Sequence, residues 1–305
     1  MDPSSSPRGV FAPVVTPFDN TLMPDARRLE RHARWLLSQD VGLAVFGTNS
    51  EANSLSVGER IDLLEHLVSA GLPPSRMMPG TGCCALTDTV ALTRRAVELG
   101  CAGVLMLPPF YYKGVSDEGL YASFAETIER VADPRLRIYL YHIPPVSQVP
   151  ISLALIDRLL AAYPRIIAGI KDSSGEWSNT QALLERFQPR GLDVFAGSER
   201  FLLATLRCGG AGCISATANV NPAAIARLAR SWRQPDADAQ QAGLDAVRAA
   251  FQQFPMIPAL KAAIAHFADD EQWATVRPPL LKLASERRVA LIDSLRPTGY
   301  AMPGL

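Results

Sequence analysis

The stretch Arg165-Ile166-Ile167-Ala168-Gly169-Ile170-Lys171-Asp172-Ser173-Ser174-Gly175 places a lysine at the end of a short apolar run. An apolar run bounded by Gly and Ser is typical of a strand that is buried on both faces, as the strands of parallel sheets are. The residues after Lys171 have the composition of a turn that leads from this strand into a helix. The stretch therefore predicts a buried parallel strand that ends on a lysine.

Strand-like and helix-like segments alternate over about 220 residues around this stretch. The expected strands are 9–15, 43–46, 76–80, 102–107, 137–141, the run ending at 171, 193–197 and 211–215. The expected helices are 25–38, 86–99, 117–131, 151–162, 177–187, 201–207 and 222–232. A further helix is expected to begin at the Ser56/Glu59 capping box and to end near residue 70. Eight such units favour a closed (β/α)8 TIM barrel with its active site on the loops after the strands. A doubly wound open sheet is the alternative, but no G-x-G-x-x-G follows the first strand.

The pattern changes after residue 232, where helices are expected without strands between them, at 240–251, 257–267 and 280–295. The break at 234–237 divides a barrel over residues 9–233 from a C-terminal helical region over residues 234–305. Residues 1–8 are polar and rich in Pro and Ser, without an apolar core. They predict a disordered tail and not a signal peptide.

The composition excludes several classes of partner. The net charge is zero, which argues against nucleic acid and against an anionic membrane surface, and no apolar run is long enough to span a bilayer. Five cysteines without C-x-x-C spacing are typical of reduced thiols, so we expect a cytoplasmic protein. The four histidines are scattered, so we expect no metal site.

Lys171 is a candidate nucleophile. The chain has 30 basic residues, of which four are lysines, so arginine supplies most of the surface charge and a lysine at a strand end stands out. An ammonium group is costly to bury and tends to lose its proton, and a neutral amine can form a Schiff base with a carbonyl substrate. The alternative is that the Lys171 side chain extends from the barrel mouth into solvent and has no catalytic role.

Three other polar residues fall at expected strand ends and so at the same face of the barrel: Thr48, Tyr112 and Tyr141. Each has a structural alternative. Thr48 with Glu51 could be only a capping box, and Tyr141 could be a core residue with a satisfied hydroxyl.

Two neighbouring residues are ambiguous in the same way. Ser173 and Glu176 also have the spacing of a capping box, so Ser173 could cap a helix instead of contacting a ligand. His142 could act at a barrel mouth, although a lone histidine is more often structural.

Taken together, five motifs resemble the dihydrodipicolinate synthase / N-acetylneuraminate lyase superfamily in order and spacing. They are Gly47-Thr48-Asn49-Ser50-Glu51, Phe110-Tyr111-Tyr112, Tyr141-His142-Ile143-Pro144, Gly169-Ile170-Lys171-Asp172 and Gly197-Ser198-Glu199. The resemblance extends from Thr16-Pro17-Phe18 to the C-terminal helices. It implies a (β/α)8 barrel with a C-terminal helical region, assembled as a homotetramer of tight dimers or as a homodimer.

The resemblance also implies roles for individual residues. Lys171 would attack the ketone of pyruvate or of another 2-keto acid, and the N–H groups of Thr48 and Asn49 would hold the carboxylate. Tyr141 would move protons, hydrogen-bonded through Thr48 to Tyr112, which the neighbouring subunit lends in relatives. The protonated imine on Lys171 withdraws electrons from the adjacent carbon, so no cofactor or metal is expected.

Further matches and departures concern the substrate. Gly197 and Ile214 match positions that line the pocket through backbone groups, and Ser173 matches a residue that contacts a substrate hydroxyl in related aldolases. Synthases of the family have a carboxylate-binding arginine where this chain has Val146, and valine cannot make a bidentate contact. Ala216 stands where sialic acid lyases have a serine.

These features favour a class I, Schiff-base-forming aldolase or lyase. Its substrate would be pyruvate or a small hydroxylated 2-keto acid, such as 4-hydroxy-2-oxoglutarate or a 2-keto-3-deoxy sugar acid. The alternatives are a 4-hydroxy-tetrahydrodipicolinate (dihydrodipicolinate) synthase that condenses pyruvate with aspartate semialdehyde, a catalytically silent protein that binds keto acids, and, more remotely, a metal-dependent aldolase.

Overall fold

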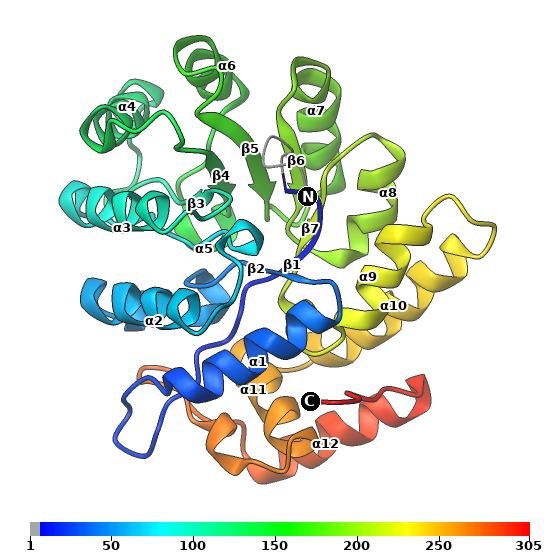
Figure 1. The fold of residues 1–305 in the computed structure, drawn as a ribbon. Helices are drawn as coiled ribbons and strands as arrows, with labels where there is room; N and C mark the ends of the chain where they lie inside the picture. Colours follow the sequence, from blue (N-terminus) through cyan, green and yellow to red (C-terminus); the bar gives the residue numbers. More distant parts are fainter. Residues whose placement is uncertain (1–6) are drawn as a thin grey trace. The chain divides into compact units, whose positions relative to one another are not determined.

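The computed structural model describes residues 7–305, whose ribbon is drawn in Figure 1. These residues form two compact units. The central unit is Pro73–Cys213 together with the described residues Pro7 and Arg8. The terminal unit is Gly9–Leu72 with Ile214–Leu305. A disordered tail was predicted over residues 1–8, of which residues 1–6 lie outside the described part of the chain. Within the described part, Arg8 forms a surface ion pair with Asp193 at 3.3 Å.

The strands of the central unit pair in parallel, in the order β7-β6-β5-β4-β3. They are β3 (Val104–Met106), β4 (Ile138–His142), β5 (Ile167–Asp172), β6 (Asp193–Ala196) and β7 (Gly212–Ile214), whose last residue already belongs to the terminal unit. Every residue of β4 is buried, and so is every residue of β5 except Ala168. The predicted burial of the Lys171 strand on both faces is therefore confirmed.

The strand expected at 76–80 is reduced to a single parallel bridge between Gly80 and Leu105. Leu105 donates its N–H to the carbonyl of Pro79 and accepts from the N–H of Thr81, each at 2.9 Å. Pro79 has no N–H of its own, so a regular ladder cannot continue through it. The prediction of a full strand here was wrong, although the segment lies beside β3.

Helices alternate with these strands in the central unit, and Figure 1 shows α3, α4, α6 and α7 outside the strands. Their bounds are α3 Leu86–Glu98, α4 Asp117–Val131, α5 Pro144–Ser147, α6 Leu153–Ala162, α7 Trp177–Phe187 and α8 Leu202–Arg207, with 3-10 helices η3 Pro74–Arg76, η4 Gln188–Arg190 and η5 Glu199–Phe201. Ser116 and Ser152 cap α4 and α6 by accepting a backbone N–H of the first turn. The helices expected at 117–131 and 177–187 are confirmed.

In the terminal unit, β1 (Gly9–Ala12) pairs in parallel with β2 (Gly42–Leu43). The helices are α1 Ala26–Ser38, α2 Val57–Ser69, α9 Pro222–Ser231, α10 Ala237–Gln252, α11 Met256–Phe267 and α12 Ser285–Leu295, with η1 Thr48–Ser50, η2 Ala52–Ser54, η6 Ala216–Asn219, η7 Glu271–Ala274 and η8 Arg296–Thr298. The predicted capping box of α2 is confirmed, because Ser56 and Glu59 exchange hydrogen bonds at 3.2 and 2.8 Å.

Two predicted features of the C-terminal region have different outcomes. The helix expected at 280–295 begins only at Ser285, and Leu281 is 81% exposed, so its apolar side chain does not belong to a buried helix face. The boundary predicted at 234 does not coincide with the division into units, which joins residues 9–72 to the C-terminal helices. A separate C-terminal helical region over 234–305 stays a prediction.

Candidate active site

Lys171 lies near the end of β5, where the register pairs it with Tyr141 of β4 and Phe195 of β6. Gly169, two residues earlier on the same face, is paired with Tyr139. A Cβ on Gly169 would lie 2.4 Å from the Tyr139 ring, so only glycine leaves room for this aromatic side chain. The Gly-Ile-Lys sequence thus accommodates a tyrosine below the lysine and brings the next tyrosine beside it.

The amine of Lys171 is enclosed and lies against an aromatic ring. Both Lys171 and Tyr141 are 2% exposed, and Nζ lies 4.1 Å from the centroid of the Tyr141 ring. No carboxylate among residues 7–305 forms an ion pair with this amine. A shielded amine beside a phenol, without a carboxylate bound to it, is the arrangement that Schiff-base chemistry needs.

Asp172, the next residue, is buried and fully hydrogen-bonded. Its carboxylate accepts from Thr180 Oγ1 at 2.6 Å and from the N–H and hydroxyl of Ser174 at 3.0 and 3.1 Å. These bonds connect the end of β5 to the turn that follows it and to α7. Asp172 therefore fixes the backbone that carries Lys171.

His142 follows Tyr141 and is buried. Its Nδ1 accepts the N–H of Ile151 at 3.1 Å, which places the proton of the neutral ring on Nε2. Burial lowers the pKa of His142, and the charge of Asp172 opposes that shift. These contacts agree with the interpretation of His142 as a structural residue and do not require a role in the reaction.

Ser173 and Gly197 lie against each other. Ser173 donates its N–H to the carbonyl of His142, and Gly197 donates its N–H to the carbonyl of Asp172, both at 2.7 Å. A Cβ on Gly197 would lie 2.1 Å from Ser173 Oγ. Ser173 does not cap a helix, because α7 begins at Trp177 without a side-chain cap and it is Ser174 that accepts the N–H of Glu176.

Tyr112 lies on the loop after β3 and is 73% exposed. Its ring packs edge to face on Tyr111, with centroids 5.4 Å apart. The next residue, Lys113, donates to the carbonyls of Phe110 and Ser147, which holds the loop beside α5. The two tyrosines are thus presented outward on a fixed loop.

Thr48 and Asn49 belong to the terminal unit, where they open the 3-10 helix η1 after β2. Ser50 closes the turn, because its hydroxyl accepts the N–H of Gly47 at 3.1 Å and its carbonyl accepts the hydroxyl of Thr16 at 2.7 Å. The N-cap of η1 is Gly47, and Thr48 is the first residue inside that helix, so the capping-box alternative for Thr48 and Glu51 was wrong. Ile214, the last residue of β7, is also in this unit and is buried.

Sequence reasoning missed a buried ion pair beside η1. The Nζ of Lys261 lies 2.6 Å from Oε1 of Glu51, and neither side chain is exposed at all. The available signal was the position of Lys261, which interrupts the apolar run of α11. A lysine inside such a helix requires a buried partner of opposite charge.

Two further findings concern what the site and the chain lack. Over residues 7–305 we find no group of three or more His, Cys, Asp or Glu side chains that could hold a metal ion. No helix in that range is long and apolar enough to cross a membrane.

Comparisons with known proteins agree with this architecture. The model of the dihydrodipicolinate synthetase family matches residues 6–297. A protein described as an uncharacterized DapA-like lyase, from Chloroflexus aurantiacus, is 38% identical over 94% of this chain and 95% of its own length.

Among solved structures, dihydrodipicolinate synthase from Agrobacterium tumefaciens superimposes with a TM-score of 0.87 at 32% identity, covering 95% of this chain and 99% of its own. YagE from E. coli K12, solved in complex with pyruvate, also gives 0.87, at 25% identity over 96% and 99%. The predicted (β/α)8 fold with C-terminal helices is confirmed by these likenesses. The chain therefore belongs to the dihydrodipicolinate synthetase family.

Proposed function

We propose that this protein is a class I aldolase or lyase that forms a Schiff base between Lys171 and pyruvate or a small hydroxylated 2-keto acid. The observation that carries the proposal is the enclosed amine of Lys171, 4.1 Å from the Tyr141 ring and without an ion-pair partner among residues 7–305. An amine held in an ion pair would have to be released before it could attack a carbonyl. The lack of such a partner for Lys171 supports the proposal.

In the proposed reaction, the Lys171 amine adds to the ketone carbon and water leaves, which gives a protonated imine. In cleavage, the bond between C3 and C4 breaks, its electron pair moves into the imine to form an enamine, and the C4 hydroxyl loses its proton as the aldehyde departs. Protonation at C3 and addition of water then release pyruvate and free Lys171. Tyr141 is proposed as the acid and base for these proton transfers.

Substrate binding is assigned on the family resemblance. The N–H groups of Thr48 and Asn49 would hold the carboxylate, backbone groups of Gly197 and Ile214 would line the pocket, and Ser173 would contact a substrate hydroxyl. The contact between Ser173 and Gly197 supports a fixed position for the serine hydroxyl.

Tyr112 is proposed to complete the site of a neighbouring copy in a homodimer or a homotetramer. Its exposure on a fixed loop supports this role. Mixing the variants Tyr112→Ala and Lys171→Ala, each of which should be inactive alone, tests this role. Exchange of subunits should restore activity if the residues of one site come from two chains. Continued inactivity of a verified mixed dimer would contradict the assignment.

The leading substrate is a small hydroxylated 2-keto acid, such as 4-hydroxy-2-oxoglutarate or a 2-keto-3-deoxy sugar acid. Val146 supports this choice, because it lies 61% exposed on α5 and cannot clamp a second carboxylate. The synthase reaction with aspartate semialdehyde is the second candidate, favoured by the likeness to the Agrobacterium enzyme. A panel of 2-keto-3-deoxy acids, read by pyruvate release, distinguishes these candidates when run beside pyruvate with aspartate semialdehyde.

Borohydride reduction in the presence of pyruvate tests the Schiff base. Peptide mapping should find the adduct on Lys171 and not on the exposed Lys282, and Lys171→Ala should remain unmodified. Folded protein that stays unmodified in excess pyruvate would contradict the proposal. A silent binding protein predicts instead that pyruvate raises the melting temperature of wild type and of Lys171→Ala equally.

We further propose that the reaction needs no cofactor and that the protein works in the cytoplasm. The imine itself supplies the electron sink, so activity should survive EDTA. Loss of activity on chelation, with recovery on adding a divalent metal, would favour the metal-dependent alternative.

A further inference from the structure

Glu51, directly after the η1 turn, has an unusual backbone conformation. Its φ of 56° and ψ of 34° lie in the left-handed region, which residues other than glycine seldom adopt. Its side chain is held at both oxygens: Oε1 accepts from Lys261 Nζ at 2.6 Å, and Oε2 accepts the N–H of Arg277 at 3.0 Å. The carboxylate therefore connects the turn to α11 and to the segment after η7.

Lys261 is an unusual residue for the middle of α11. The helix is buried from Pro258 to Ala265, and the Phe18 ring lies 4.4 Å from the ammonium group. Burial lowers the pKa of Lys261 to about 8, and Glu51 opposes that shift. The Glu51 carboxylate, 2.6 Å from Nζ, favours the charged form of the amine.

Arg277 extends the same anchor. Its guanidinium donates to the carbonyls of Ser54 and Leu22 at 2.6 and 2.8 Å, and to both oxygens of Glu59 at 2.5 and 3.0 Å. The chain is therefore held at Glu51, at the end of η2 and at the first turn of α2.

The other side of the turn is held by Ser50 and Thr16, through the bonds described above. Thr48 and Asn49 lie between these two attachments. Any movement of Glu51 would change the direction of their N–H groups, since a left-handed residue that loses its anchor relaxes toward the helical or extended regions.

A buried ion pair is weak evidence for stability, because two apolar side chains of similar volume often stabilise a protein equally well. We propose that the Glu51–Lys261 ion pair positions the backbone of Thr48 and Asn49 for binding the carboxylate of the 2-keto acid, an inference that rests on the proposed function. Glu51 and Lys261 are positioning residues, since neither is assigned a contact with the substrate.

The experiment removes both charges at once. In Glu51→Gln/Lys261→Met, the amide oxygen can still accept the N–H of Arg277, and no unpaired charge is left inside the protein. The double variant should therefore melt closer to wild type than Glu51→Gln or Lys261→Met alone, each of which leaves one buried charge without its partner.

The readout is the pyruvate concentration that gives half-maximal borohydride-trapped adduct on Lys171. Positioning predicts an increase of at least tenfold in the double variant, while the adduct at saturating pyruvate stays complete. Glu51→Asp, which keeps the charge and shortens the side chain, should raise the half-saturating pyruvate concentration at least fivefold. This variant tests the proposal if the double variant does not fold.

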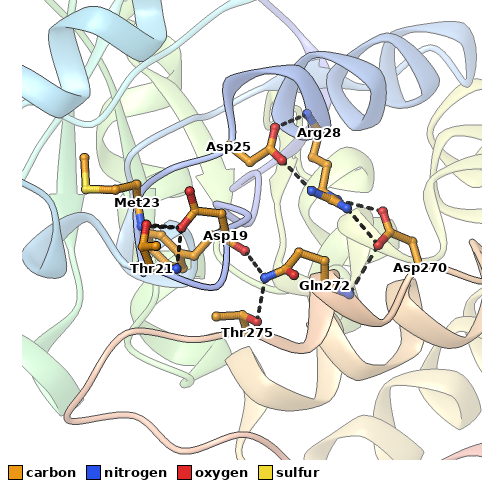
Figure 2. A network of polar contacts seen from close by, with 9 residues as sticks. Asp19, Thr21, Met23, Asp25, Arg28, Asp270, Gln272 and Thr275 are labelled. Atoms are coloured by element: carbon orange, nitrogen blue, oxygen red, sulfur yellow. Dashed lines mark hydrogen bonds and ion pairs between the residues drawn. The ribbon is translucent and has the colours of Figure 1, made fainter.

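Asp270→Asn is the matched control in the terminal unit. It breaks the ion pair between Asp270 and Arg28 on α1, which is half-buried and lies outside the Glu51 anchor (Figure 2). It should lower the melting temperature and leave the half-saturating pyruvate concentration unchanged. If the double variant or Glu51→Asp has the same half-saturating pyruvate concentration as wild type, the positioning role is wrong, while the proposed function is unaffected. Absence of any adduct in wild type overturns the proposed function as well.

Discussion

The hydroxyl oxygen of Ser173 occupies the place that a side chain on Gly197 would need, 2.1 Å from an ideal Cβ. The same Cβ would lie 2.6 Å from the carbonyl oxygen of Asp172 and 2.8 Å from the Cα of Ser173. We expect Gly197→Ala to lower the free energy of unfolding by about 1–3 kcal/mol, because backbone atoms must move to admit the methyl group. Urea unfolding measures this loss.

Two variants make the prediction for Gly197 specific. Adding Ser173→Ala should not rescue Gly197→Ala, since two of the three close atoms belong to the backbone. Gly243 lies in the exposed middle of α10, and a Cβ there would meet no atom of another part of residues 7–305 within 4 Å. Gly243→Ala should therefore stabilise by about 0.5–1 kcal/mol, because alanine is the better helix former. Equal stability of Gly197→Ala and wild type would show that the contact is looser than described.

Tyr141→Phe keeps the ring beside Lys171 and removes the hydroxyl. We expect trapping of pyruvate on Lys171 to persist while turnover falls by about 10²-fold or more, the usual contribution of a general acid or base. Tyr139→Phe, two residues earlier in the same strand, is the matched control and should keep its turnover. Should both variants turn over alike, Tyr141 would be only a packing residue.

His32 lies in the core of the terminal unit between two tryptophans, with ring centroids 5.5 Å from Trp35 and 5.2 Å from Trp273. Among the described residues, neither ring nitrogen has a hydrogen-bond partner of normal geometry. Burial lowers the pKa of His32 to about 4, and the Asn219 side chain opposes that shift. The unfolded chain therefore binds one more proton than the folded chain between about pH 6.5 and pH 4.

Stability should consequently fall as the pH drops through this window, by about 3 kcal/mol from this group alone at pH 4, of which about 2 kcal/mol is already lost at pH 5. In His32→Leu that part of the decline should be absent, while stability at pH 7 is unchanged or higher because two unpaired polar atoms are removed. Urea unfolding at pH 7 and pH 5 measures both effects. His266→Leu, at an exposed position, is the control, and identical pH dependence in wild type and His32→Leu would contradict the assignment.

The success and failure of sequence reasoning follow from how local each signal is. Helix α4 was predicted at its bounds because its pattern lies within one segment, and the structure adds that Ser116 caps it. The segment 280–284 has the same spacing but is not helical, and Leu281 is exposed to water while Leu280 and Leu283 are only half-buried. Apolar periodicity does not report whether a partner surface exists.

The candidate site shows the same division. The motif around Lys171 is continuous in sequence, so the position of the amine and of Tyr141 on adjacent strands followed from strand order. The pair of Glu51 and Lys261 joins positions 210 residues apart, and no local pattern relates them. An ion pair between such distant residues depends on how the helices pack, and packing cannot be inferred from local sequence patterns.

Val146 provides the last prediction, which concerns the choice between aldolase and synthase. Its exposed position on α5 can take a longer side chain without repacking, so Val146→Arg should change the free energy of unfolding by less than about 0.5 kcal/mol. A guanidinium there can bind a second carboxylate through two parallel hydrogen bonds. We therefore expect Val146→Arg to gain activity with pyruvate and aspartate semialdehyde in a coupled assay. Val146→Lys should gain less activity, because an ammonium group is a point charge without the planar, two-pronged geometry of a guanidinium. If wild type already condenses pyruvate with aspartate semialdehyde at the rate of Val146→Arg, Val146 does not determine the substrate.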